Sequence, residues 1–185
     1  LTPYELIEYS SQSAQAHARA LPSSNPPVAM KVLHLYISSE HNYIGHHGQP
    51  AGQCPIVEKE AMHCLAGRGI EGDRFLDHKE NYKGQITFFA HEVYQSLRET
   101  LPAADAPPSV FRRNVVTRDV DLNSLIGEEF EVQGIRFRGV EECKPCYWMD
   151  EAFHPGAKAA MQGRGGLRAQ ILTDGVLRVD RAMIG

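Results

Sequence analysis

The sequence predicts a mainly β fold with short helices (α+β), and two observations lead to this prediction. Short apolar runs bounded by turn residues recur along the chain, as at residues 32–37, 61–65, 85–89 and 135–142. The most extended helical spacing of apolar side chains covers only residues 91–101. Short strands, tight turns and few helices favour a barrel over a doubly wound sheet.

The first strand should follow an N-terminal extension. Residues 1–29 are rich in Ser, Ala, Gln and Pro, which is typical of a loosely ordered arm, although residues 4–20 would suit a short helix. The domain proper then spans residues 30–185 and opens with the apolar strand at residues 32–37. Strands at residues 61–65 and 85–89 follow it.

The next elements are one helix and one hairpin. Val93, Leu97 and Leu101 give residues 91–101 a single apolar face, and Pro102 ends this helix. A helical turn over residues 122–126 should stop at Gly127. Residues 129–133 and 135–142 then form a hairpin around Gly134.

The C-terminal part predicts a short helix and a second hairpin. The helix covers residues 154–162, with Pro155 in its first turn. The pair Asp174-Gly175, between apolar runs at 167–173 and 176–179, is typical of a tight hairpin turn.

Composition limits the classes of function. The chain has 185 residues, a formal net charge of −4 and four cysteines. We therefore expect one domain, no uniformly basic nucleic-acid face and no disulfide scaffold. There is neither an apolar run of about 18 residues nor a secretory leader, so we expect no membrane association and a cytoplasmic location.

An arginine pair is the first part of a candidate site. Arg112 and Arg113 carry planar guanidinium groups that suit phosphate or another anion, and the Asn114 amide can donate and accept hydrogen bonds. Two adjacent arginines are also common on solvated faces or in salt-bridge clusters.

A Cys-Lys-Pro-Cys run is the second part. Pro145 cannot extend a strand, so the chain should leave the sheet there and carry Cys146 on a loop, with Cys143 and Lys144 before it. A loop thiol beside cations would be held partly as the thiolate, the form that attacks sulfur or binds a soft metal. Burial of either thiol in the core is the alternative. A thioredoxin-like motif is less favoured, since no βαβ pattern surrounds it.

Glycine-rich segments complete the candidate site. Around Arg164, the glycines 163, 165 and 166 would let backbone amides approach a ligand, with Arg164 and Arg168 as further anion partners. Near Gly72, Asp73 could orient Arg74 toward the same anion, or the two could form a structural ion pair.

A histidine-rich loop lies at residues 40–53. His41, His46 and His47 could suggest zinc, but a four-ligand site would need the distant Cys54 or His63 as well. We therefore expect a solvated or substrate-contacting loop, with His46 and His47 as secondary candidates.

Several of these motifs occur in the order and spacing of a known family. Arg112-Arg113-Asn114-Val115-Val116-Thr117, Cys143-Lys144-Pro145-Cys146 and Gly163-Arg164-Gly165-Gly166 resemble the MOSC domain, the C-terminal module of molybdenum cofactor sulfurases. The segments Asp121-Leu122-Asn123-Ser124-Leu125-Ile126-Gly127, Gly67-Arg68-Gly69-Ile70-Glu71-Gly72-Asp73-Arg74-Phe75 and Gly84-Gln85-Ile86-Thr87 extend the resemblance, which covers roughly residues 31–181.

This resemblance implies a MOSC-type β-barrel of mixed and antiparallel strands that binds the molybdenum cofactor (molybdopterin). Cys146 matches the cysteine that ligates molybdenum or accepts sulfur in the family. The predicted cofactor-binding residues are Arg74, Arg112, Arg113, Asn114, Lys144, Arg164, Gly165 and Arg168, with Cys143, Asp73, His46 and His47 as secondary candidates. Pyridoxal phosphate is not expected, because the chain has no room for the separate domain that carries it in the sulfurases.

Three functions stay open at this point. The first is an oxidoreductase that reduces N-hydroxylated compounds at molybdenum, with an unidentified redox partner. The second is a metal-free sulfur carrier in which Cys146 accepts persulfide sulfur from a donor protein and Cys143 resolves it. The third is a module that binds an anionic small molecule without turnover.

Overall fold

The structure is a computed structural model that describes residues 29–46, 48–101 and 106–181. The predicted N-terminal extension, apart from Ala29, and His47 lie outside these residues. The strands are β1 (Lys31–Ile37), β2 (Val57–Lys59), β3 (Ala61–Leu65), β4 (Gly69–Ile70), β5 (Ile86–Ala90), β6 (Val115–Arg118), β7 (Glu129–Val132), β8 (Ile135–Glu142), β9 (Leu167–Ile171) and β10 (Gly175–Arg178). The helices are α1 (His91–Thr100), α2 (Trp148–Ala152) and α3 (Ala157–Ala160), with the 3-10 turns η1 (Pro108–Phe111) and η2 (Leu122–Leu125).

The strands form two sheets. The larger has the order β2-β1-β6-β5-β9-β8-β7, and the smaller has the order β10-β3-β4. Neighbouring strands are antiparallel except β5 and β6, which are parallel. A parallel pair needs a long crossover, and α1 lies in the connection between these two strands.

The prediction of a mainly β domain with short helices is confirmed. Within the described residues, β2 and β7 are the edge strands of the larger sheet and do not pair with each other. The closed barrel that the family resemblance implies therefore stays a prediction.

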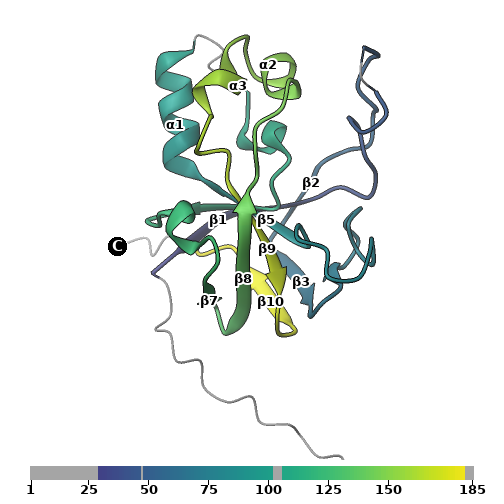
Figure 1. Cartoon of the computed structure of the whole chain (residues 1–185), viewed down its shortest axis with the longest axis vertical. Coiled ribbons are helices and arrows are strands. Elements are labelled where there is room, and N and C mark those ends of the chain that lie inside the picture. The colour runs from purple at the N-terminus through teal and green to yellow at the C-terminus, as the bar shows by residue number, and fades with distance from the viewer. Residues whose placement is uncertain (1–28, 47, 102–105, 182–185) are drawn as a thin grey trace, which may run out of the picture.

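Two apolar clusters stabilise the domain, and β5 contributes to both. Successive side chains of a strand point to opposite faces, so Phe88 packs in the core shared by the two sheets while Phe89 packs in a second cluster. This second cluster joins α1, η1, α2 and α3, which gather at one end of the molecule in Figure 1.

The predicted hairpin at Asp174-Gly175 is wrong. β9 pairs with β5 and β8 in the larger sheet, whereas β10 pairs with β3 in the smaller one. The chain changes sheets at this turn because Asp174 Oδ1 accepts the Ala66 backbone N–H at 2.7 Å. Gly175 also packs so closely on Ile135 that a Cβ would lie 2.5 Å from its side chain.

The region after Cys146 also differs from the prediction. The expected helix over residues 154–162 is reduced to α3 (Ala157–Ala160), and the unpredicted helix α2 precedes it. Trp148 and Met149 of α2 are buried in the helical cluster. Gly156 has a φ of +97°, in the left-handed region, so a helix cannot run through it from Pro155 and α3 begins only at Ala157. Among the described residues, no helix combines the length and apolar character needed to cross a bilayer.

Candidate functional site

The Cys-Lys-Pro-Cys run forms a loop at the end of β8. β8 ends at Glu142, and the loop leads into α2. The Cys143 backbone N–H donates to the Gly166 carbonyl at 2.7 Å, which holds the start of the loop against the glycine-rich segment. Cys143 is buried and Cys146 is exposed, and both are free thiols. The loop therefore presents the second thiol to solvent while it packs the first.

Cys146 lies on the wall of a cleft that we call the Cys146 cleft, with a volume of about 140 Å³. Side chains of two thiols, four arginines and several aromatic residues surround it. The lining residues are His41, Asn42, Tyr43, Ile44, Arg74, Phe75, Tyr82, Gly84, Thr87, Phe111, Arg112, Arg113, Cys143, Cys146, Met149 and Arg168. Among the described residues, the lining contains four guanidinium groups and no carboxylate, so an anion is the ligand that its charge favours.

Arg112 has a donor that the described residues leave unused. Its Nη2 donates to the Ser38 hydroxyl at 3.1 Å and to the Glu40 carbonyl at 3.0 Å, and its guanidinium lies 5.2 Å from the centre of the Tyr43 ring. The residue is only 7% exposed, and its buried Nη1 has no hydrogen-bond partner among the described residues. A buried donor without a partner costs about 1–3 kcal/mol, and a bound anion would remove that cost.

The backbone of Arg112 is also unusual. Its φ of 55° places it in the left-handed region at the end of η1. This conformation costs a non-glycine residue about 1 kcal/mol or more and is common at functional sites. Burial lowers the pKa of Arg112, and the neighbouring charge of Arg74 lowers it further. The charged guanidinium is thus held in an environment that favours an added negative charge.

Arg113 differs from Arg112, because its guanidinium binds backbone carbonyls within the protein. Its three guanidinium nitrogens donate to backbone carbonyls: Nε to Gly165 at 3.1 Å, Nη1 to Phe111 at 2.7 Å and Nη2 to Cys143 at 3.0 Å. Arg113 therefore ties the glycine-rich segment and the thiol loop to the end of η1. It borders the cleft, but its donors are engaged within the protein.

Asp73 fixes Arg74 at the cleft. The carboxylate is 5% exposed, and its Oδ2 lies 3.3 Å from Arg74 Nη1. It also accepts the backbone N–H groups of Ser38 at 3.3 Å and Phe75 at 3.1 Å. Burial lowers the pKa of Arg74, while Asp73 opposes that effect. The ion pair foreseen as one alternative is present, and it orients Arg74 along the cleft wall.

Asn114 links Asp73 to the backbones of β1 and β5 through its side-chain amide. Its Oδ1 accepts the Thr87 hydroxyl at 2.8 Å and the Thr87 backbone N–H at 3.1 Å. Its Nδ2 donates to Asp73 Oδ2 and to the Tyr36 carbonyl, each at 3.2 Å. The side chain amide is fully engaged within the protein, so Asn114 positions the site and does not line the cleft.

Arg168 closes another side of the cleft. Its Nη1 lies 3.5 Å from the Tyr82 hydroxyl. Its Nε is 3.5 Å from Glu141 Oε1, close enough for an ion pair, but the geometry is not that of a hydrogen bond and Nε has no hydrogen-bond partner. Arg168 is therefore the second cleft arginine, after Arg112, with an unsatisfied donor among the described residues.

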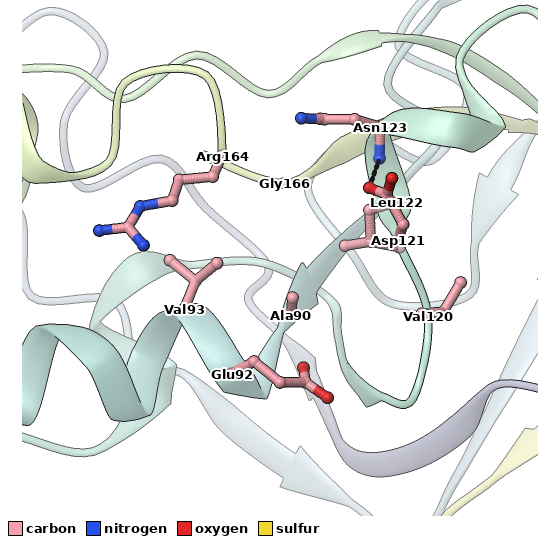
Figure 2. A pocket seen from close by; sticks show the side chains of 9 residues that line it. All are labelled: Ala90, Glu92, Val93, Val120, Asp121, Leu122, Asn123, Arg164 and Gly166. Atoms are coloured by element: carbon pink, nitrogen blue, oxygen red, sulfur yellow. Dashed lines mark hydrogen bonds between the residues drawn. The ribbon is translucent and has the colours of Figure 1, made fainter.

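The other predicted residues lie outside the cleft lining. Lys144 is exposed, and Gly165 is buried with its N–H donated to Glu142 Oε1 at 3.1 Å. Arg164 borders a separate cavity of about 320 Å³, shown in Figure 2, where its side chain extends over Val93. Its Nε donates to the Ala160 carbonyl at 2.9 Å. Arg164 thus lies away from the Cys146 cleft, and the anion role expected for it stays a prediction.

The histidine-rich loop contributes one unexpected residue. His46 does not line the cleft, and its Nδ1 lies 2.9 Å from the Pro50 carbonyl. His41 does line the cleft, with its ring edge-on to Phe75 at 4.9 Å between centres. Within the described residues, no cluster of three His, Cys, Asp or Glu side chains is arranged to hold a metal ion.

The mostly β fold and a thiol in an arginine-lined cleft define the class of protein. Residues 46–183 match the family model of the MOSC domain. The chain therefore belongs to the MOSC domain family.

Two solved structures have a similar fold. The YuaD protein from Bacillus subtilis has 15% sequence identity and a TM-score of 0.63, over 81% of this chain and 91% of that one. YiiM from Escherichia coli has 16% identity and a TM-score of 0.54, over 80% and 71% of the two chains. At these identities the likeness shows the fold alone. No curated protein matches the sequence.

Proposed function

We propose that this chain binds the molybdenum cofactor with Cys146 as the molybdenum ligand or as the acceptor of a sulfur atom. MOSC domains are associated with molybdenum cofactor chemistry, and the chemistry of the cleft fits that group. A thiolate is a soft ligand, and the surrounding guanidiniums suit phosphate and other anionic groups.

The observation that carries the proposal is that Arg112, whose buried Nη1 has no hydrogen-bond partner among the described residues, lines the same cleft as the exposed thiol Cys146. Arg112 and Arg168 would hold the anionic groups, because both have unsatisfied donors. Arg74 would add charge from its place beside Asp73. Arg113 and Asn114 would keep these groups in position without direct contact.

The size of the cleft limits what it encloses. Sites for drug-sized ligands usually measure about 300–1,000 Å³, and this cleft measures about 140 Å³. It would therefore enclose one end of the cofactor, the end that meets Cys146 and the arginines. When bound, the cofactor would supply the electron transfer that reduces a substrate such as an N-hydroxylated compound.

Metal and pterin analysis of Cys146→Ala tests the proposal. Protein made in a host competent for molybdenum cofactor synthesis should contain molybdenum and pterin fluorescence, and this variant should lose most of the molybdenum. Cys54→Ala is the matched control, since Cys54 is a partly exposed free thiol outside the cleft lining. Full molybdenum content in Cys146→Ala would refute the role of this thiol as a ligand.

A sulfur carrier is the second candidate, because Cys143 and Cys146 line the same cleft. In this reaction the Cys146 thiolate attacks the outer sulfur of a donor persulfide, and the donor leaves as a thiolate. Attack by Cys143 would then release hydrosulfide and leave a disulfide between the two residues. Intact mass measurement after incubation with a persulfide donor should show one added sulfur in Cys143→Ser, a disulfide (two hydrogens lost) in the wild type, and neither change in Cys146→Ala.

A further inference from the structure

We propose that His41 is the proton-exchanging group of the Cys146 cleft, and that its imidazole gains a proton when an anion binds between the arginine side chains. The inference extends the proposed function to a residue that the sequence motifs do not single out. It rests on that function only in that the cleft must take an anion.

The position of His41 is fixed from both sides along the chain. The Glu40 carbonyl before it accepts Arg112 Nη2 at 3.0 Å. Asn42 after it is clamped to Cys54, with Nδ2 donating to the Cys54 carbonyl at 2.7 Å and Oδ1 accepting the Cys54 N–H at 2.9 Å. The backbone before His41 is thus held by Arg112, and the residue after it is held by Cys54, while the His41 ring lies in the cleft lining against Phe75.

His41 differs from the other titratable groups in the lining. Arginine stays protonated in proteins, and burial raises the pKa of Tyr43 above its usual value. Histidine is the side chain whose ordinary pKa of about 6.5 lies in the physiological range. Among the lining residues, His41 is therefore the group suited to exchange a proton near neutral pH.

The charges that face His41 are mostly positive. Arg74 and His78, from the segment between β4 and β5, and Arg112, from the segment after η1, disfavour the imidazolium, while Asp73 favours it. Burial and then the two arginines lower the pKa of His41. In the free protein the imidazole is thus neutral at pH 7.

A bound anion reverses this balance. Negative charge beside Arg74 and Arg112 offsets their repulsion, so the pKa of His41 rises and the imidazole takes up a proton. By linkage, the anion must bind more tightly as the pH falls through the interval between the two pKa values. The imidazolium would then add a donor to the bound anion or supply a proton to a substrate held there.

Sulfate binding measured by calorimetry tests this inference, because sulfate keeps its charge across the pH range used. At constant ionic strength, the wild type should bind sulfate about fivefold more tightly at pH 5.5 than at pH 7.5 if binding raises the pKa of His41 by about one unit, a shift whose limiting effect over a wider pH range is about tenfold. In His41→Gln the affinity should change by less than about twofold over the same range. Two buffers of different ionisation enthalpy would show proton uptake in the wild type directly.

His78→Gln is the matched control. His78 packs on the same Phe75 ring at 5.5 Å but is exposed and does not line the cleft, so this variant should keep the pH dependence. Sulfate binding without proton uptake in the wild type would overturn the role of His41 alone. The role of His41 would also be overturned if His41→Gln kept the full pH dependence of sulfate binding. His41→Asn is a second variant that tests the same outcome. No sulfate binding by the wild type at any pH would overturn the anion cleft as well.

Discussion

Arg113 Nη2 donates to the carbonyl oxygen of Cys143 at 3.0 Å, across 30 residues of sequence. This contact joins the arginine pair to the thiol loop. The other two nitrogens of the same guanidinium reach the carbonyls of Phe111 and Gly165. A single side chain thus fixes three backbone segments around the cleft.

Arg113→Lys should therefore destabilise the fold. An ammonium group cannot reach three carbonyls that are spaced for a planar guanidinium, so at least one buried acceptor loses its partner. We expect a loss of about 3 kcal/mol in the free energy of unfolding, measured with urea. Arg164→Lys is the control, because Arg164 is exposed, and it should change stability by less than about 0.5 kcal/mol. Equal effects of the two changes would contradict the bracing role of Arg113.

Thiol accessibility gives a second prediction. Cys146 is exposed and Cys54 is partly exposed, whereas Cys64 and Cys143 are buried. A thiol reagent should modify two cysteines rapidly in the native protein and the other two only after unfolding. Burial raises the pKa of Cys64 to about 12, so this thiol should be the slowest. Peptide mapping of the modified sites would check the order, and rapid modification of Cys143 would contradict it.

The two arginines of the pair should respond differently to an anion. Sulfate should raise the melting temperature of the wild type, because ligand binding stabilises the folded state. Arg112→Gln should lose most of this increase, since the unpartnered Nη1 belongs to Arg112. Arg164→Gln should keep it, because Arg164 borders the separate cavity of Figure 2. A sulfate response that survives in Arg112→Gln would remove Arg112 from the anion site.

Asn114→Asp should couple stability to pH. The new carboxyl would lie beside Asp73, whose Oδ2 is 3.2 Å from Asn114 Nδ2, in a buried position. Repulsion and burial raise the folded-state pKa of the new carboxyl above its unfolded value of about 3.9. The penalty should be full at neutral pH, about 3 kcal/mol or more, and should fade as the pH drops toward the unfolded value. Urea unfolding at several pH values would measure it, and a penalty independent of pH would contradict this account.

The thiol loop was predictable because its signal is local. Pro145 has no backbone N–H, so the end of β8 and the position of Cys146 on a loop follow from the sequence alone. The sequence did not predict that Arg113 would bind backbone carbonyls while Arg112 keeps an unpartnered donor. This difference depends on the carbonyls of Cys143 and Gly165, which are 30 and 52 residues away in the chain.

The turn at Asp174-Gly175 and the position of His41 were also not predictable from the sequence, because both depend on contacts between residues that are distant in the chain. Asp174-Gly175 has the local signal of a hairpin, but the contact of Asp174 with Ala66, 108 residues away, directs the chain into the other sheet. The three histidines of one loop look alike in sequence. His41 reaches the cleft because Arg112 and Cys54 hold the residues on either side of it.

Gly165→Ala should displace the thiol loop. A Cβ at residue 165 would lie 2.5 Å from the Cys143 carbonyl oxygen and 2.8 Å from Pro145 Cδ, distances that require the backbone to move. We expect a loss of about 2–3 kcal/mol in the free energy of unfolding from this overpacking, together with a change in the reactivity of Cys146. Gly163→Ala is the matched control, since no atom lies within 4 Å of its Cβ position. Its φ of +74° alone should cost about 1 kcal/mol and leave Cys146 reactivity unchanged. Wild-type stability and thiol reactivity in Gly165→Ala would show that the loop does not depend on this close contact.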